Sequence, residues 1–279
     1  MIRSVPPLAT LALLCLPCAA PAQTPPVPDR ADRIPSHCIA LARNIDRVIP
    51  ATFGAPLDAD TVRIRFIDHA TFTLETPGGL LAATDFTGFL GPISRRPDVV
   101  TMNNAHRTHW TDAPDPDIPH VLKGWADNGR PAFHDLDLGE MLVRNVPTDV
   151  RDWQGGIRKD GNSIFIFEVA GLCIGHLGHL HHQPDALQYA SIGRLDVVMV
   201  PVDGGYTMPV EEMEQVIHRL RSSVVLPMHW FSGASLETFL ADMGREFEVR
   251  RLDTPDVVLS LHSLPSRPTI MVLTPSWEP

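Results

Sequence analysis

Apolar and polar positions alternate with a period of two residues near the start of the chain, as they do in half-buried β-strands. Residues 62–67 read Val-Arg-Ile-Arg-Phe-Ile, and residues 71–76 read Thr-Phe-Thr-Leu-Glu-Thr. A Pro-Gly-Gly turn at 77–79 separates the second run from Leu-Leu-Ala at 80–82. This pattern predicts a strand followed by a β-hairpin.

The second half of the chain changes to strands that alternate with helices. Residues 209–221 place apolar side chains at helical spacing, with acids in the first turn and bases in the last. Ser235 is expected to cap a helix over residues 236–243, which Gly244 ends. Apolar runs predict strands at 97–102, 163–169, 195–201, 223–228, 247–252, 257–261 and 269–273. Strands, then βα units, then more strands predict an α/β fold with two sheets between outer helices.

The first 22 residues have the pattern of a secretory signal peptide. Arg3 precedes an apolar core at 8–16, and Ala20-Pro21-Ala22 favours cleavage after Ala22. Because the apolar run is shorter than the roughly 20 residues that cross a bilayer, an uncleaved anchor is the weaker alternative. We expect a disordered Pro-rich leader at 23–34 and a single domain at 35–279, which begins with an amphipathic helix. The protein would then be periplasmic or secreted.

Charge and cysteine content narrow the function classes. The net charge is −10, and loss of the signal with Arg3 makes it −11 (22 minus 33). So acidic a chain is a poor nucleic-acid binder, which leaves a small molecule as the expected partner. No later stretch predicts stable membrane insertion, and the sequence does not define an oligomeric state. Cys38 and Cys173 could form a disulfide, but the apolar strand around Cys173 favours a buried thiol.

Histidines gather where predicted strands end. Four of the chain's 13 histidines lie in residues 176–182, directly after an apolar run. His106 and His109 follow the strand at 97–102, and His229 follows the strand at 223–228. A single histidine in such a place is usually an ordinary residue, but three such sites at one sheet edge predict a metal site. We treat the histidines without partners in the sequence as ordinary: His37, His120, His134, His218 and His262.

Five segments between about residues 63 and 230 resemble the metallo-β-lactamase superfamily, in its ascorbate-6-phosphate-lactonase-like branch. They are Ile-Asp-His-Ala-Thr-Phe (67–72), Leu-Ala-Ala-Thr-Asp (81–85), His-Leu-Gly-His-Leu-His-His (176–182), Pro-Val-Asp-Gly-Gly-Tyr-Thr-Met (201–208) and Leu-Pro-Met-His-Trp (226–230). Each match is weak alone, but together they keep the family's order. The resemblance implies a four-layer αβ/βα sandwich with a metal site at the sheet edge and hydrolytic chemistry.

The chain departs from the family pattern at the ligands. The motif His-x-His-x-Asp-His reads Asn104-Ala-His106-Arg-Thr108-His109, and the family's bridging aspartate falls at His179. The resemblance therefore implies the metal ligands His106, His109, His179 and His229. Four neutral imidazoles favour one ion, with zinc first and a second ion, iron or manganese as alternatives. Additional candidates, as ligands or supporting residues, are Asn104, His176, His182 and Asp85.

These features predict a metal-dependent hydrolase that attacks a small ester, lactone or phosphodiester through a metal-bound water. Asp203 is a candidate for orienting the nucleophile, and Tyr206 for donating to a developing oxyanion. The loops at 104–119, 150–162 and 231–235 are expected to line the pocket. One alternative is a catalytically degenerate fold that binds a metal or small ligand without turnover, because two acidic positions have changed. Another is an iron site with redox chemistry.

Overall fold

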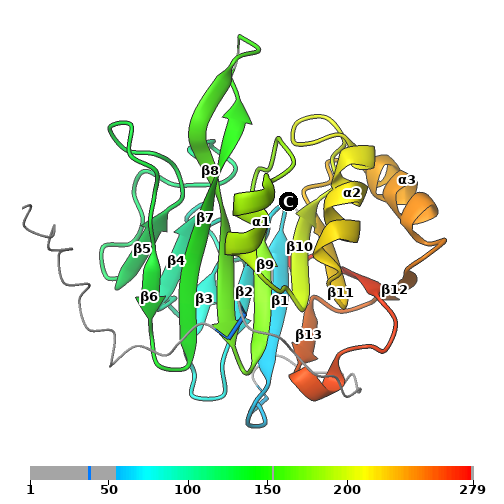
Figure 1. Ribbon diagram of the computed structural model, residues 1–279. Helices are drawn as coiled ribbons and strands as arrows, with labels where there is room; N and C mark the ends of the chain where they lie inside the picture. Colours follow the sequence, from blue (N-terminus) through cyan, green and yellow to red (C-terminus); the bar gives the residue numbers. More distant parts are fainter. Residues whose placement is uncertain (1–36, 39–54, 153, 278–279) are drawn as a thin grey trace, which may run out of the picture. The chain divides into compact units, whose positions relative to one another are not determined.

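The computed structural model describes residues 37–38, 55–152 and 154–277 (Figure 1). The signal at 1–22, the leader at 23–34 and almost all of the helix expected from residue 35 lie outside these residues. The described residues belong to one compact unit, Ile34–Pro279. Within them, no helix combines the length and the apolar character needed to cross a membrane.

Two β-sheets form the frame of this unit (Figure 1). The six-stranded sheet has the order β13-β1-β2-β3-β4-β5. Its strands are β1 (Val62–Asp68), β2 (Thr71–Glu75), β3 (Leu81–Ala83), β4 (Val99–Met102), β5 (His120–Lys123) and β13 (Asp256–Leu259). β1, β2 and β3 pair antiparallel. This confirms the predicted strand and hairpin.

The eight-stranded sheet has the order β12-β14-β11-β10-β9-β8-β7-β6. Its strands are β6 (Asp135–Asp137), β7 (Met141–Arg151), β8 (Ile157–Val169), β9 (Leu172–His176), β10 (Val197–Pro201), β11 (Val224–Met228), β12 (Glu248–Leu252) and β14 (Thr269–Leu273). The strands from β9 to β12 in this order pair in parallel. Their carboxyl ends therefore meet at one edge.

Three apolar layers hold the sheets and helices together. The central layer joins the inner faces of both sheets, for example Phe66 of β1 and Phe165 of β8. A second layer packs α1 (Ala186–Ile192), α2 (Val210–Leu220) and α3 (Gly233–Met243) on the outer face of the eight-stranded sheet. A third covers the outer face of the six-stranded sheet, where loop residues such as Phe86, Leu90 and Ile118 pack on β4. The fold is the predicted α/β sandwich, with loops over this second outer face in the described residues.

Two local predictions were wrong. Residues 150–162 do not form a loop, because β7 and β8 continue as a paired hairpin beyond the other strands (Figure 1). Backbone pairing keeps these polar residues in strand conformation without an apolar face. Ser235 does not cap α3, which starts at Gly233 after the extended Ser232. Its hydroxyl instead donates to the carbonyl of Ser232 at 3.5 Å, within the first turn.

Cys38 and Cys173 form a disulfide, so the interpretation of Cys173 as a buried free thiol was wrong. Their Cα atoms lie 5.6 Å apart, although 135 residues separate them in sequence. Strand β9 holds Cys173 in the core, and the backbone N–H of Arg194 donates to the carbonyl of Cys38. The sequence could not reveal the pairing, because the position of Cys38 against β9 is a tertiary contact.

Removal of this cross-link should destabilise the protein. The disulfide joins residues 135 positions apart and so restricts the unfolded chain. A Cys38→Ser, Cys173→Ser variant should therefore lose about 2–5 kcal/mol of unfolding free energy. Urea unfolding with and without a reductant measures the loss. The reductant should destabilise the wild type and leave the double variant unchanged. Equal stability of the wild type and the double variant without reductant would contradict a structural role for the disulfide.

Candidate metal centre

Five histidines from four loops converge at one end of the sandwich. His69 lies in the turn between β1 and β2, and His106 and His109 lie in the loop after β4. His179 follows β9, and His229 follows β11. The prediction of a single sheet edge was wrong, because β1 and β4 belong to one sheet while β9 and β11 belong to the other. The cluster forms where the two sheets meet.

Two overlapping groups of three histidines could each hold an ion. In each group the donor nitrogens lie within 4.8 Å of one another. One group is His69, His109 and His229, and the other is His106, His109 and His179. His109 belongs to both. The structure therefore brings together all four histidines proposed from the sequence and adds His69.

His69 was missed in the sequence analysis. Its ring centroid lies 4.1 Å from that of His229 and 5.4 Å from that of His109. Its backbone carbonyl accepts a hydrogen bond from the N–H of His229 at 2.6 Å, which joins the two sheets at the site. The available signal was a histidine in a two-residue turn between two buried strands, inside a segment already matched to the family.

Buried carboxylates orient the two central histidines. Asp85 is fully buried and accepts a hydrogen bond from Nδ1 of His109. Oδ2 of Asp203 lies 2.8 Å from Nδ1 of His229. Oδ1 of Asp203 accepts backbone N–H groups of the loop at 205–207. Asp85 is thus a supporting residue. Asp203 contacts a histidine and its own loop, and its role in orienting the nucleophile stays a prediction.

The arrangement of His109 and His229 fits a bound cation. Both Nδ1 atoms are directed at carboxylates, and the two Nε2 atoms face each other at 3.1 Å. Two nitrogens held at about 2.0–2.1 Å by one tetrahedral zinc ion lie roughly 3.3 Å apart. Nε2 of His69 and both ring nitrogens of His179 are also buried without a hydrogen-bond partner in the described part of the chain. Such buried polar atoms are costly unless something binds them.

Burial disfavours positive charge on these imidazoles. It lowers the pKa of His69 to about 3, helped by the nearby His229 and His109. Burial and the same kind of repulsion also hold the pKa values of His109 and His179 well below the usual range. Burial therefore favours His69, His109 and His179 as neutral nitrogen donors, the form in which histidine binds metals.

The carboxylates respond to their surroundings in opposite directions. Burial raises the pKa of Asp85 to about 7, against a smaller opposing effect of His176. Burial also raises the pKa of Asp203, but hydrogen bonds from His229 and Thr207 outweigh it and leave that pKa below its ordinary value. A cation on the far side of His109 would favour the ionised form of Asp85.

His176 and His182 do not join the cluster. Nε2 of His176 donates to the carbonyl of Ala70 at 2.8 Å, and its Nδ1 accepts from the N–H of Gly178 at 3.1 Å. Both ring nitrogens are used inside the fold, so the structure contradicts a ligand role for His176. His182 lies beyond His181, with ring centroids 6.4 Å apart, and is not among the residues that line the cavity described below.

Three residues of the site adopt the left-handed backbone conformation that non-glycine residues rarely adopt. They are His69 (φ 46°), Asp85 (φ 49°) and His229 (φ 61°). His69 and His229 directly follow the ends of β1 and β11, and Asp85 lies two residues after β3. Such conformations cost of the order of 1–3 kcal/mol each and persist where the surroundings impose them. The histidine positions are thus maintained against a local backbone preference.

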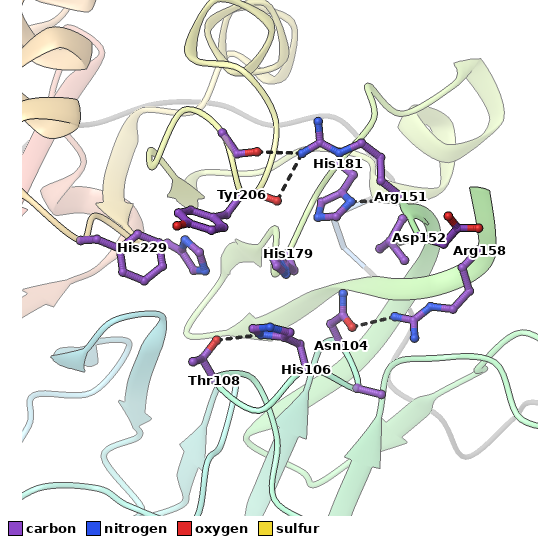
Figure 2. A pocket seen from close by; sticks show the side chains of 14 residues that line it. Asn104, His106, Thr108, Arg151, Asp152, Arg158, His179, His181, Tyr206 and His229 are labelled. Atoms are coloured by element: carbon purple, nitrogen blue, oxygen red, sulfur yellow. Dashed lines mark hydrogen bonds between the residues drawn. The ribbon is translucent and has the colours of Figure 1, made fainter. Parts of the chain in front are cut away.

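A cavity of about 560 Å³ opens above the histidines (Figure 2). His106, His179 and His229 form part of its lining. Tyr206 also lines it and is 70% exposed, with its ring edge against Phe231 at 5.1 Å between centroids. Tyr206 thus lies at the cavity, and its role toward an oxyanion stays a prediction. Of the predicted pocket loops, all three contribute: 104–119 and 231–235, and the hairpin that replaces the loop at 150–162.

The residues that depart from the family motif have other contacts here. Oδ1 of Asn104 accepts a hydrogen bond from Nη2 of Arg158 at 2.9 Å. The Thr108 hydroxyl lies 3.1 Å from Nδ1 of His106. Thr108 therefore supports a histidine, while Asn104, which was a candidate ligand, holds an arginine at the cavity wall (Figure 2).

Comparison with known proteins agrees with this geometry. Residues 63–229 match the family model described as the beta-lactamase superfamily domain. A UPF0173 metal-dependent hydrolase of Pyrococcus abyssi is 24% identical over 191 residues, which are 61% of this chain and 84% of the relative. Another, of Archaeoglobus fulgidus, is 23% identical over 221 residues, 71% of this chain and 96% of the relative.

A solved structure shows the same fold at higher identity. It is a proposed Zn-dependent hydrolase of the metallo-beta-lactamase superfamily from Thermotoga maritima, 28% identical with a TM-score of 0.53. The alignment covers 76% of this chain and 98% of the other. The resemblance seen in the sequence is confirmed at the superfamily level. The chain belongs to the beta-lactamase superfamily, and its relatives support its assignment as a metal-dependent hydrolase.

Proposed function

We propose that this protein is an exported hydrolase that uses one divalent metal ion, zinc, to cleave a small ester, lactone or phosphodiester. The observation that carries the proposal is the approach of the Nε2 atoms of His109 and His229 to 3.1 Å. A carboxylate backs each ring on its other side. This arrangement is common where histidine binds a metal, because the carboxylate fixes the tautomer and the ring orientation.

The donor set supports one ion. His109 belongs to both histidine groups, and its Nδ1 is directed at Asp85, so its one remaining nitrogen can bind only one metal. His109 and His229 would be the central ligands, completed from His69, His106 and His179. Nitrogen donors in tetrahedral sets suit zinc, whereas iron and manganese sites usually include carboxylates. When bound, zinc supplies Lewis acidity and lowers the pKa of water that it coordinates.

The chain's own residues would prepare the site for hydrolysis. Asp85 and Asp203 hold the Nδ1 protons of the central histidines and direct Nε2 toward the cavity side. Arg151 donates through Nη2 to three carbonyls of the loop at 205–207, and so positions Tyr206 at the mouth. The Tyr206 hydroxyl is available there to donate to an oxyanion. The cavity volume suits a small substrate.

Export is supported by the disulfide as well as by the N-terminal pattern. Disulfides persist in the bacterial periplasm and outside cells and are rare in the reducing cytosol. Cys38 and Cys173 are paired in the fold. The cross-link joins Cys38, which precedes β1 in the chain, to Cys173 of β9.

Metal content should depend on the cluster. We expect about one zinc per chain in wild-type protein purified without a tag or chelator, and loss of that zinc in His109→Ala, His229→Ala. His69→Ala should weaken zinc affinity by roughly 10-fold or more, because removal of a ligand should cost at least as much affinity as removal of a residue that only orients a ligand. Elemental mass spectrometry and chelator competition measure both.

The matched control is His218→Ala, because His218 is exposed on α2 and away from the cavity. It should keep the wild-type metal content. Absence of bound metal in wild type, even after loading with zinc, iron or manganese, would contradict the metal centre.

Hydrolysis should require the same residues. The wild type should cleave at least one of 4-nitrophenyl butyrate, δ-valerolactone and bis(4-nitrophenyl) phosphate, with the rate falling to background in His229→Ala. The assay is initial rate in zinc-loaded protein. Activity retained in His229→Ala would rule out catalysis at this centre, and inactivity toward every class would oppose the proposed substrate range.

Export has its own test. In a bacterial host the full chain should appear in the periplasmic fraction with an N-terminus at Gln23, and its two cysteines should resist thiol alkylation until reduced. A form that lacks residues 2–22 should stay in the cytosol with free thiols. An intact N-terminus on protein recovered from the cytosol would contradict the proposed signal.

A further inference from the structure

Arg158 presents unused hydrogen-bond donors on the wall of the cavity. Its Nη2 donates to Oδ1 of Asn104 at 2.9 Å and approaches the carbonyl of Gly161 at 3.5 Å. No acidic group of the described residues forms an ion pair with it. A guanidinium carries five N–H donors in a fixed planar fork, so Nε and Nη1 can still bind a ligand.

The neighbouring residues position this guanidinium. A Cβ atom at Gly161 would lie 2.7 Å from Nε of Arg158, so glycine provides the room in which the side chain lies. Asn104 is 3% exposed, and because arginine only donates, its Oδ1 must face Arg158. The amide Nδ2 is then the other group that Asn104 can offer. Together, Arg158 and Asn104 form a surface of donors without an acceptor, which favours an anion.

Backbone groups hold the other two charged side chains of the cavity lining, Arg151 and Asp152. Arg151 donates to three backbone carbonyls of the loop at 205–207. Oδ1 of Asp152 accepts the backbone N–H groups of Gln154 and Gly156, in the turn of the hairpin. Arg151 is thus fixed against the loop at 205–207, whereas the guanidinium of Arg158 stands beside the carboxylate of Asp152. That carboxylate adds negative charge to the same wall, which favours a monoanion over a doubly charged phosphate ester.

The opposite wall is aromatic. Phe231 packs edge-on against His229 with ring centroids 5.1 Å apart, and Tyr206 packs against Phe231. Figure 2 shows Tyr206 and His229 on one side of the cavity, Arg158 and Asp152 on the other, and His106 and His179 between them. A substrate that spans the cavity would place an apolar group on the aromatic side, its scissile bond above the histidines and its charge at Arg158.

We propose that the substrate carries a carboxylate, bound by Arg158 and Asn104, and an apolar group that packs on Tyr206 and Phe231. This inference rests on the proposed hydrolase function and deepens it, because it assigns the position that lacks the family's first histidine to substrate recognition. Asn104 anchors the arginine that selects the substrate's charge.

The test compares esters that differ only in charge. The substrates are 4-nitrophenyl hydrogen adipate, its neutral methyl ester, and an analogue of equal length that ends in a phosphate monoester. Wild type should prefer the carboxylate over both others in kcat/KM. Arg158→Gln should lower kcat/KM for the carboxylate by roughly 10-fold to 100-fold, the value of one hydrogen bond to a charged group, and change it less than about threefold for the methyl ester.

Lys159→Gln is the matched control, since it removes the same charge from the adjacent residue. Lys159 is 76% exposed in its side chain and pairs with Asp149, and it does not line the cavity. It should leave all three rates unchanged. Arg158→Lys, which keeps the charge and loses the planar fork, should give an intermediate rate for the carboxylate.

Binding separates this proposal from the proposed function. Monomethyl adipate, titrated into metal-free wild-type protein and into Arg158→Gln by calorimetry, should bind the wild type at least 10-fold more tightly. If every ester is inert but this difference holds, the hydrolase substrate range fails and carboxylate recognition stands. Equal binding, an equal rate loss for charged and neutral esters, or a preference for the phosphate analogue would each overturn the inference.

Discussion

The approach of His109 and His229 is the constraint on which the site depends. The two residues come from different sheets, so their Nε2 atoms meet only because the sheets pack face to face through a continuous apolar core. The hydrogen bond from the N–H of His229 to the carbonyl of His69 holds the sheets together at the same point. A shift of either sheet would separate the donors, so core packing and metal-binding geometry are coupled.

Buried carboxylates make this approach specific. Asp85 lies two residues after β3, and Asp203 lies two residues after β10. The carboxylate of each lies against Nδ1 of one imidazole. Burying charge without a partner is expensive, and neutral imidazole compensates a carboxylate only in part. A divalent cation on the other side of the rings would complete the balance. The left-handed backbone at His69, Asp85 and His229 indicates that the fold imposes this geometry.

Thr108 and Asn104, which depart from the family motif, make polar contacts beside the histidine cluster. Thr108 takes the place of an acid and contacts the ring of His106, while Asn104 takes the place of a histidine and holds Arg158. Both keep a polar contact beside the cluster, but neither adds negative charge. The β7–β8 hairpin supplies Arg151 and Arg158, one to fix the loop that carries Tyr206 and one to face the cavity. In the proposed substrate site, Asn104 thus connects the changed ligand position to the arginine that would bind the carboxylate.

The amino-acid sequence by itself determined most of the strand and helix order, the α/β class, the superfamily and four of the five clustered histidines, but it did not indicate β5, β6 or β7. These features follow from local periodicity and from histidines placed directly after apolar runs, which a chain displays without folding. Only the tertiary structure decided that His69 joins the cluster, that His176 does not, that Asp203 supports His229, and that Cys38 pairs with Cys173. Each of these depends on which strand ends face one another across two sheets, and the direction of a side chain at a sharp backbone turn is not a local property of the sequence.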